Sequence, residues 1–218
     1  MISYVIRLGK EAGCVFLKNL LSEYEARSMI CEYGRRLYSR GLVAGNEGNI
    51  SCRIGDNEVI VTPTMESKGY MDPDMLVKVD LDCNKISGSY DYSSETLMHL
   101  GIYKARKDIT AVVHAHPVVA TAFACCGKNV KIDSIAEAAL FFGGELIVTP
   151  YAALGTAAVP ESIAPHLSGR RALLLGNHGA LTWAATLKEA CFLMESLEQI
   201  CRIFLVSEKL LDGSVPIL

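Results

Sequence analysis

Short runs of β-branched and aliphatic residues alternate with helix-like stretches along this chain, and no other feature limits its fold as strongly. The strand-like runs are residues 57–64, 76–82, 111–117, 145–151 and 171–179. Amphipathic stretches that begin with helix-start signals precede, separate and follow these runs. Such an alternation predicts an α/β fold, in which helices cover one sheet.

Two capping signals mark the long helices at the ends of this pattern. Ser22 and Glu25 have the S-x-x-E form of a capping box, and Gly41 is a natural stop for the helix that they open. Thr186 and Glu189 begin a second long helix in the same way. We expect this final helix to reach about residue 211.

Length and composition predict one well-buried domain. The 218 residues are 50% hydrophobic and carry a net charge of −3, and no repeat or linker divides them. We expect residues 22–218 to form this domain and residues 1–21 to form a helical extension. A mildly acidic chain without Lys/Arg runs gives no electrostatic case for nucleic acid. No apolar run reaches the roughly 18–20 residues that span a bilayer.

The N-terminus and the cysteines favour a cytoplasmic protein. Arg7, Lys10 and Lys18 interrupt the apolar residues at the start of the chain, so no signal-peptide core is present. The eight cysteines include no C-x-x-C pair, which disfavours a cysteine zinc site. A chain of this length builds its own core without disulfides. We therefore expect buried free thiols in a reducing cytoplasm.

Three of the five histidines have the arrangement of a metal site. His114 and His116 lie two residues apart in a predicted strand, so both imidazoles project from the same face of the sheet. His178 lies in the segment GNHG, where an apolar strand gives way to a turn, and its flanking glycines allow a close approach of the backbone. Three neutral imidazoles with one position left for a carboxylate or water are typical of a catalytic zinc site.

A carboxylate and a set of anion donors meet at a predicted helix start. Glu95 follows Ser93 and Ser94 and lies one turn before His99 on the same helix face. The free backbone N–H groups of this turn favour an anion. Further donors occur at Asn49 and Ser51 in the glycine-rich loop AGNEGNIS and at Thr64, and Lys68 would add positive charge. A metal cation nearby would allow a carboxylate and a phosphate to share such a site.

The ordered set of these segments resembles one protein family. GNEGNIS, TPT, SSE, HAH, PYAALGT and GNHG occur in this order. Over about residues 23–218 the chain is similar to the class II aldolase/adducin family, and within it to the L-fuculose-1-phosphate aldolases. The resemblance implies a three-layer α/β/α sandwich with a central, mainly antiparallel sheet. It also implies a homotetramer with active sites between subunits.

The same resemblance implies a zinc-dependent aldolase. His114, His116 and His178 would bind one Zn²⁺ per subunit, and Glu95 would be the catalytic acid/base. The positions that match the family's phosphate-binding residues are Asn49, Thr64, Ser93 and Ser94. The implied reaction is the reversible cleavage of a ketose 1-phosphate of the fuculose, rhamnulose or 5-deoxyribulose type. Its products would be dihydroxyacetone phosphate and an aldehyde.

Two alternatives and two departures from the family pattern accompany this interpretation. A pentulose-phosphate 4-epimerase would share the cleavage step, although Ser-Ser-Glu favours an aldolase. An adducin-like interaction module would lack the three histidines.

Met65 stands where the aldolases have glycine, and Glu137 stands near the position of a tyrosine that protonates the aldehyde half. Residues 1–21 could pack on a subunit, or could dock the enzyme in a bacterial microcompartment shell or on a partner.

Overall fold

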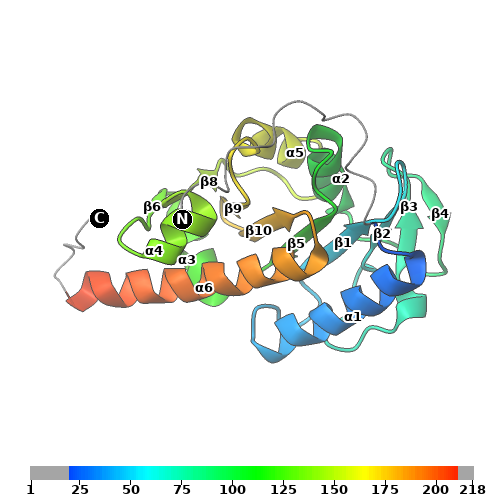
Figure 1. Cartoon of the computed structure of the whole chain (residues 1–218), viewed down its shortest axis with the longest axis horizontal. Helices are drawn as coiled ribbons and strands as arrows, with labels where there is room; N and C mark the ends of the chain where they lie inside the picture. The colour runs from blue at the N-terminus through cyan, green and yellow to red at the C-terminus, as the bar shows by residue number, and fades with distance from the viewer. Residues whose placement is uncertain (1–19, 211–218) are drawn as a thin grey trace, which may run out of the picture.

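The computed structural model describes residues 20–210 (Figure 1). The helical extension expected for residues 1–21, and any docking through it, therefore lies almost entirely outside the described residues. The elements follow in the order α1 (Glu23–Ser39), β1 (Asn49–Arg53), β2 (Val59–Val61), η1 (Pro73–Met75), β3 (Val77–Val79), β4 (Lys85–Ser87), α2 (Thr96–Ala105), β5 (Ala111–Ala115), α3 (Val118–Cys126), β6 (Val130–Lys131), α4 (Ala136–Phe142), β7 (Glu145–Leu146), β8 (Val148–Thr149), α5 (Ala158–Ile163), η2 (Ala164–His166), β9 (Ala172–Leu175), β10 (Gly179–Ala184) and α6 (Leu187–Leu210).

An eight-stranded sheet forms the middle of the molecule. Its strand order is β4-β3-β2-β1-β5-β10-β9-β8. Every neighbouring pair is antiparallel except β8 and β9, which run parallel. The mainly antiparallel sheet that the resemblance implied is therefore confirmed. A separate two-stranded sheet pairs β6 with β7.

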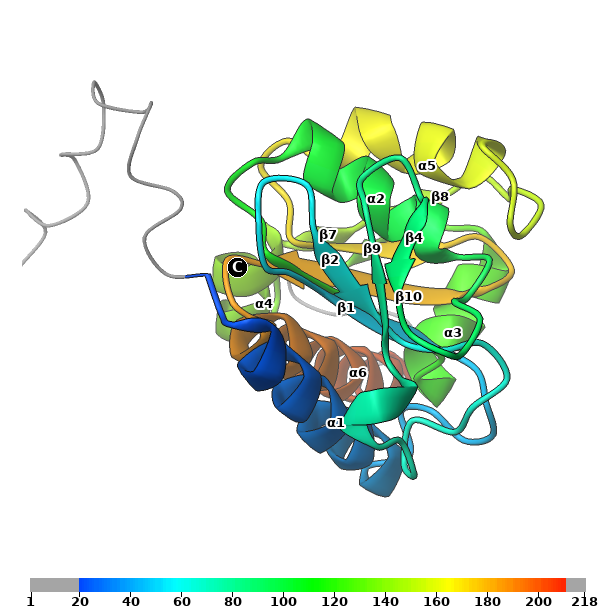
Figure 2. The same cartoon turned by 90° about the vertical axis from the view of Figure 1, so that its right-hand side faces the viewer.

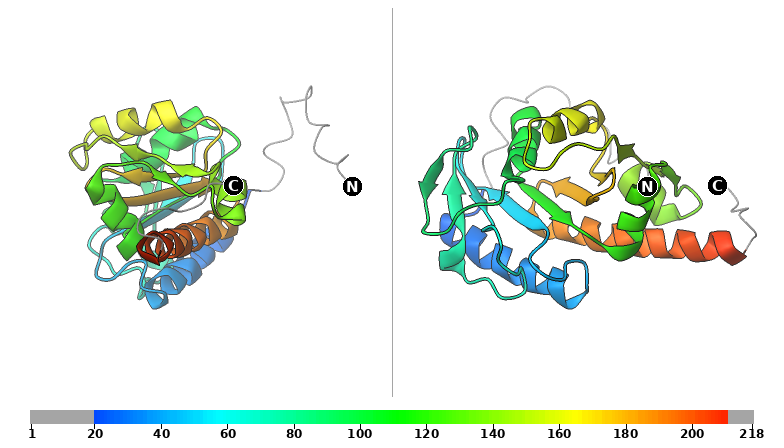
Figure 3. Two further views of the ribbon diagram at one scale, coloured as in Figure 1. Left: turned by 90° about the vertical axis from the view of Figure 1, so that its left-hand side faces the viewer. Right: turned by 180° about the vertical axis from the view of Figure 1, so that it is seen from behind.

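Helices cover both faces of the sheet and make a three-layer sandwich (Figures 2 and 3). Side chains alternate between the two faces along each strand. On β5, Ala111, Val113 and Ala115 belong to the hydrophobic cluster shared with α1, α3 and α6. Val112 belongs to the other cluster, which includes α2 and α5. His114 has the same parity as Val112, so its side chain faces the α2 layer.

The predicted caps of the long helices are confirmed. Ser22 Oγ accepts from the Glu25 N–H, and the Glu25 carboxylate accepts in return from the Ser22 N–H, which completes the capping box of α1. Gly41 takes a left-handed φ of 68° just after this helix. The Thr186 hydroxyl accepts from the N–H of Glu189 at the start of α6.

Several predicted boundaries were wrong. The strand expected over 171–179 is two strands, because β9 ends at Leu175 and β10 begins at Gly179 after a turn. The run 145–151 is also divided, into β7 and β8. The segment AGNEGNIS is only partly a loop, since β1 begins at Asn49. Helix α2 begins at Thr96, one residue after Glu95.

The cysteine prediction was only partly right. All seven cysteines among the described residues are free thiols, as expected. Cys125 and Cys126 are exposed and Cys83 is half-buried, whereas we expected burial. Cys14 lies outside the described residues. No helix within residues 20–210 combines the length and apolar character needed to cross a membrane.

Candidate active site

The three predicted metal ligands come from neighbouring strands in the middle of the sheet. His114 is the last residue but one of β5, and His116 follows directly after that strand. His178 lies in the turn that joins β9 to β10. Strand β10 pairs with β5, where Leu181 is opposite His114. The hairpin therefore returns His178 to the strand end that carries the other two imidazoles.

Two glycines allow this hairpin to lie close to its neighbours, with Gly179 against the end of β5 and Gly176 against the end of β8. A Cβ atom at Gly179 would lie 2.6 Å from His116 Cδ2 and 2.7 Å from the Ala115 carbonyl oxygen. A Cβ at Gly176 would collide with the carbonyl oxygen of Thr149. The close backbone approach that we inferred from the GNHG segment is therefore a property of the structure.

The imidazoles converge on one point. His114 Nε2 lies 3.2 Å from His178 Nε2 and 3.1 Å from His116 Nε2. Tetrahedral zinc with Zn–N bonds of about 2.0–2.1 Å separates two ligand nitrogens by roughly 3.3 Å. Among residues 20–210 this is the one group of three or more His, Cys, Asp or Glu side chains placed to hold a metal ion. The donor set and its spacing fit a divalent cation.

Hydrogen bonding and burial prepare the imidazoles to act as ligands. His114 Nδ1 lies 2.9 Å from the Ala180 carbonyl oxygen, which can only accept. This contact places the proton on Nδ1 and leaves the Nε2 lone pair directed at the other histidines. Complete burial lowers the pKa of His114 to about 3, and burial also lowers the pKa of His116. Both rings are therefore neutral near pH 7, as metal ligands must be.

Glu95 reaches the same point from the α2 layer. Its Oε1 lies 3.0 Å from His178 Nε2 and 3.7 Å from His114 Nε2, and the amide of Asn49 donates to its Oε2 at 2.7 Å. Burial acts to raise the pKa of Glu95. The hydrogen bonds from His178 and the Asn49 amide and the proximity of the His114 imidazole outweigh burial, so the net shift of this pKa is downward. An ionised carboxylate thus lies beside three imidazole nitrogens.

The chain that carries this arrangement is similar to known proteins. Residues 28–205 match the family described as Class II Aldolase and Adducin N-terminal domain. The chain belongs to this family.

Relatives within the class II aldolase family carry more than one activity. The chain is 30% identical to a 3-oxo-tetronate 4-phosphate decarboxylase of Haemophilus influenzae, over 84% of this chain and 89% of the relative. It is 31% identical to a 5-deoxy-D-ribulose 1-phosphate aldolase of Bacillus thuringiensis, over 82% and 83% of the two chains. A solved L-fuculose 1-phosphate aldolase superposes with a TM-score of 0.84 at 30% identity, covering 91% and 92%.

The segments with the expected phosphate residues lie next to one another in this class II aldolase fold. The N–H of Thr64 donates to the Asp91 carbonyl oxygen at 2.9 Å, and Pro63 bridges to Tyr92, directly before Ser93. The Ser93 hydroxyl accepts from the N–H of Glu95. Thr64 and Ser94 are exposed, whereas Asn49 is buried against Glu95.

Two side chains that we expected to bind an anion face the protein instead. Lys68 is 1% exposed, and its ammonium donates to the carbonyl oxygens of Asn46 and Glu66, both at 2.6 Å. It therefore ties two loops together. The Ser51 hydroxyl is fully buried and contacts His99 and Tyr103.

Met65 has a strained backbone conformation at the position where the resemblance led us to expect glycine. Its φ is 61°, a left-handed value that favours glycine, and its side chain is exposed. The Asn46 amide contacts its sulfur at 3.2 Å. The methionine therefore keeps the backbone turn of this loop and adds a side chain at the surface beside it.

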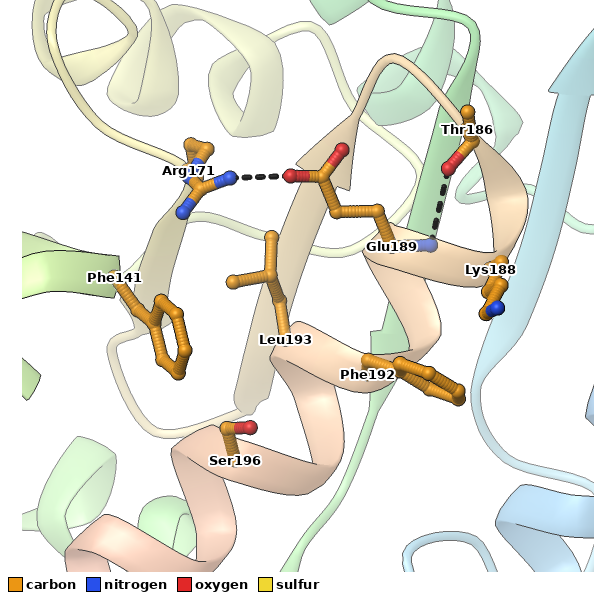
Figure 4. A pocket seen from close by; sticks show the side chains of 8 residues that line it. All are labelled: Phe141, Arg171, Thr186, Lys188, Glu189, Phe192, Leu193 and Ser196. Carbon is orange, nitrogen blue, oxygen red and sulfur yellow. Dashed lines mark hydrogen bonds and ion pairs between the residues drawn. The ribbon is translucent and has the colours of Figure 1, made fainter. Parts of the chain in front are cut away.

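An apolar hollow lies away from these residues, on the other face of the sheet (Figure 4). It has a volume of about 260 Å³ and extends along the first half of α6, between Phe141 and Phe192. Arg171 and Glu189 form an ion pair across one end of it. The hollow contains no cluster of metal-ligating side chains. A smaller hollow beside His178, lined by Thr149 and Ser162 among others, adjoins the three histidines.

Proposed function

We propose that this protein is a zinc-dependent lyase that breaks the bond between the α- and β-carbons of the ketone in a phosphorylated sugar and releases dihydroxyacetone phosphate. The observation that carries the proposal is the approach of Glu95 Oε1 to within 3.0 Å of His178 Nε2, at the point where three imidazole nitrogens converge. A carboxylate at a cation site can move a proton where negative charge develops.

Each residue has a defined task in this proposal. His114, His116 and His178 hold Zn²⁺, which supplies a Lewis acid for the substrate carbonyl. After the bond breaks, Glu95 gives a proton to the enediolate carbon. In the reverse reaction, Glu95 removes a proton from the same carbon. Asn49 holds the Glu95 carboxylate in place through its amide. Ser93, Ser94 and Thr64 lie on adjoining segments and supply donors for the phosphate.

The leading substrate class is a ketose 1-phosphate of the fuculose, rhamnulose or 5-deoxyribulose type, which an aldolase splits into dihydroxyacetone phosphate and an aldehyde. The named aldolase relatives support this class. In cleavage, the hydroxyl of the departing half passes its proton to water as the carbon–carbon bond breaks, and its oxygen becomes the aldehyde oxygen. The remaining half is an enediolate, and Glu95 delivers a proton to its carbon.

A second substrate class is favoured by the names of other relatives. A 3-oxo-tetronate 4-phosphate is a β-keto acid, so loss of CO₂ leaves the same enediolate of dihydroxyacetone phosphate. Decarboxylation needs no group to accept a proton from a departing aldehyde. Glu137, which stands near the position expected for a tyrosine in an aldolase, is compatible with this reaction. Glu95 would then protonate the enediolate carbon.

The test is turnover of a substrate panel by the zinc-loaded wild type and by Glu95→Gln, with metal content measured on both. The panel contains fuculose, rhamnulose and 5-deoxyribulose 1-phosphates and 3-oxo-tetronate 4-phosphate. We expect about one zinc per chain in both proteins. Loss of a general acid/base should slow turnover about 10²–10⁴-fold in Glu95→Gln. Glu189→Gln, which removes a carboxylate on the α6 side of the sheet, is the matched control and should keep its rate.

The products decide between the alternatives. Release of an aldehyde with dihydroxyacetone phosphate supports the aldolase, and release of CO₂ supports the decarboxylase. Conversion of a pentulose phosphate to its epimer without net cleavage would support the 4-epimerase. A wild type that binds no zinc and turns over no substrate would contradict the proposal and favour an adducin-like interaction role.

The family resemblance further supports a cytoplasmic homotetramer with active sites between subunits. Tyr151 and Leu154 are exposed large apolar side chains near Ser94, with Gly155 packed against the Ser94 side chain. Such side chains beside a site suit a neighbouring subunit. Light scattering of the purified protein, with a mass near four chains expected, tests this assignment. A monomer would contradict it.

A further inference from the structure

A row of polar side chains joins β1 to α2 beneath the candidate active site. Asn49 and Ser51 project from one face of β1, two residues apart. Glu95, His99 and Tyr103 recur every four residues along one side of α2. We call these five residues the polar ladder. Helix α2 lies on the face of the sheet opposite α1 and α6 (Figure 2).

The ladder has two rungs. In the first, the Asn49 amide donates to Glu95 Oε2 at 2.7 Å. In the second, the Ser51 hydroxyl lies 2.7 Å from His99 Nδ1 and 2.7 Å from the Tyr103 hydroxyl. The Tyr103 hydroxyl also donates to the carbonyl oxygen of Thr110 at 3.5 Å. The second rung therefore continues along α2 to the chain before β5.

The second rung is completely shielded from water. Ser51 and Tyr103 are 0% exposed and His99 is 1% exposed. Hydrogen bonds in such surroundings are strong, and losing one partner leaves another buried polar atom unsatisfied. The other buried side chains of α2 are Thr96 and the aliphatic or thioether groups of Met98, Leu100 and Ile102, which make no directional contacts. The ladder therefore supplies the directional bonds that fix the rotation of α2 on β1.

We propose that His99 and Tyr103 are positioning residues that hold Glu95 at its working distance from the three histidines, acting through Ser51. This inference rests on the proposed function. Glu95 immediately precedes the helix and its side chain makes no capping bond to it. Its location therefore depends on where the first turn of α2 lies, and the second rung fixes that turn from one helical turn away. A shift of about 1 Å at a reacting group can cost a hundredfold in rate.

The test compares zinc-loaded variants that remove one ladder contact at a time. Tyr103→Phe deletes a hydroxyl and keeps the ring, and His99→Leu deletes both ring nitrogens. We expect kcat to fall by about ten- to a hundredfold, whereas KM should change less than about threefold because the phosphate donors lie outside the ladder. His99→Asn can restore an acceptor near the Nδ1 position, so it should recover part of the lost kcat.

The matched control removes a buried hydroxyl on the opposite face of the sheet. Thr182 is 0% exposed, and its hydroxyl donates to the Ala190 carbonyl oxygen at 2.8 Å, which joins β10 to α6. Thr182→Val should lower the melting temperature about as much as Tyr103→Phe and leave kcat unchanged. The same kcat loss in Thr182→Val would show a general effect of destabilisation and would overturn the proposal.

Combination with Glu95→Gln shows whether the ladder acts through Glu95. Tyr103→Phe should add no further loss to the residual rate of Glu95→Gln, because the group being positioned is already absent. A further tenfold loss in the double variant would overturn the positioning role.

Hydrogen exchange of the zinc-loaded proteins gives a readout that needs no substrate. Exchange over Thr96–Ala105 should be faster in Tyr103→Phe and His99→Leu than in the wild type, and unchanged in Thr182→Val. Exchange could be faster in these two variants while the wild type turns over no panel substrate. That result would support the anchoring of α2 by the ladder and reject the proposed function. Unchanged exchange with unchanged kcat would reject the ladder while the proposed function stands.

Discussion

At the scale of single residues, the site depends on glycines whose positions leave no space for a side chain. The turn between β9 and β10 carries His178, and its two glycines lie against backbone and imidazole atoms of neighbouring strands. Asn177 takes a φ of 56° in the same turn, a left-handed value that asparagine tolerates better than most residues. The N–H of Asn177 also bonds to the Ala124 carbonyl oxygen of α3. The convergence of three imidazoles therefore depends on backbone geometry as well as on the ligands.

The Gly179→Ala variant tests this dependence. The new methyl group would meet His116 Cδ2 and the Ala115 carbonyl oxygen, so the imidazole or the hairpin must move. We expect zinc affinity, measured by competition with a chromogenic chelator, to fall at least about tenfold, as for disturbed supports of metal ligands. Gly127→Ala is the control, because it strains a left-handed φ of 65° but meets no atom within 4 Å. Equal zinc affinity in Gly179→Ala and the wild type would contradict this account.

How far the sequence predicts the site is also clearest at this scale. The H-x-H spacing places two imidazoles on one face by strand geometry alone, and the structure brings them together with His178. Ser51 and Lys68 were predicted as anion donors, but both are buried and bond to the protein. A donor's direction depends on which element packs above it, and local sequence carries no signal for that. The E-x-x-x-H-x-x-x-Y spacing of α2 was the one available hint of the polar ladder.

At the scale of elements, one helix caps another beside the candidate metal site. Glu198 of α6 is 3% exposed, and its carboxylate accepts from the backbone N–H groups of Val119 and Ala120 in the first turn of α3. Arg202 pairs with the same carboxylate from one turn further along α6. Helix α3 begins directly after His116 and Pro117. A carboxylate at this helix start satisfies otherwise free donors and complements the helix dipole.

Removal of this carboxylate should destabilise the protein. In Glu198→Ala the N–H groups of α3 lose a buried, charged acceptor, so we expect the free energy of unfolding to fall by about 1–3 kcal/mol. Urea denaturation followed by circular dichroism measures the change. The neighbouring Gln199→Ala replaces an exposed side chain and should stay within about 0.5 kcal/mol of the wild type. Equal stability of the two variants would show that the cap contributes nothing.

The elements that sequence reasoning missed share a physical cause. Strand β1 was read as a loop because its polar residues, Asn49 and Ser51, looked solvent-facing, although they face α2. Helix α3 has an almost wholly apolar sequence, VVATAFACC, without the polar face that marks a surface helix. In both cases the neighbouring layer decides the structure. The terminal helices carry their own caps, and for this reason they were predicted correctly.

At the scale of the whole molecule, the sheet separates two layers with different roles. The α1, α3 and α6 layer encloses the larger apolar cluster, and the α2 and α5 layer encloses the second cluster. The imidazoles and Glu95 lie at the strand ends on the α2 side. Burying histidines in this layer has a cost that depends on pH. Burial lowers the pKa of His99 to about 4 and that of His114 to about 3.

Acid should therefore destabilise the metal-free protein well before its carboxylates are all protonated. The unfolded chain protonates these histidines near pH 6.5, whereas the native chain leaves them neutral down to about pH 4. Between these values the unfolded state binds more protons, so the free energy of unfolding falls as pH falls, by up to about 1.4 kcal/mol per pH unit for each histidine. Urea denaturation at pH 7, 6 and 5 measures this slope. A flat profile over this range would show that the imidazoles protonate without cost.

The central claim is that Glu95 forms the enediolate of dihydroxyacetone phosphate by removing a proton and protonates it again, beside a cation held by the three histidines. The most direct measurement is NMR of dihydroxyacetone phosphate alone, incubated with the zinc-loaded protein in D₂O. No aldehyde or carboxylic acid is needed, so the result does not depend on which substrate class is right. We predict that the wild type exchanges one hydrogen of the hydroxymethyl carbon for deuterium, and that Glu95→Gln and the chelated wild type exchange none above background. Exchange that persists in Glu95→Gln, or its absence in a zinc-loaded wild type that turns over panel substrates, would contradict the account.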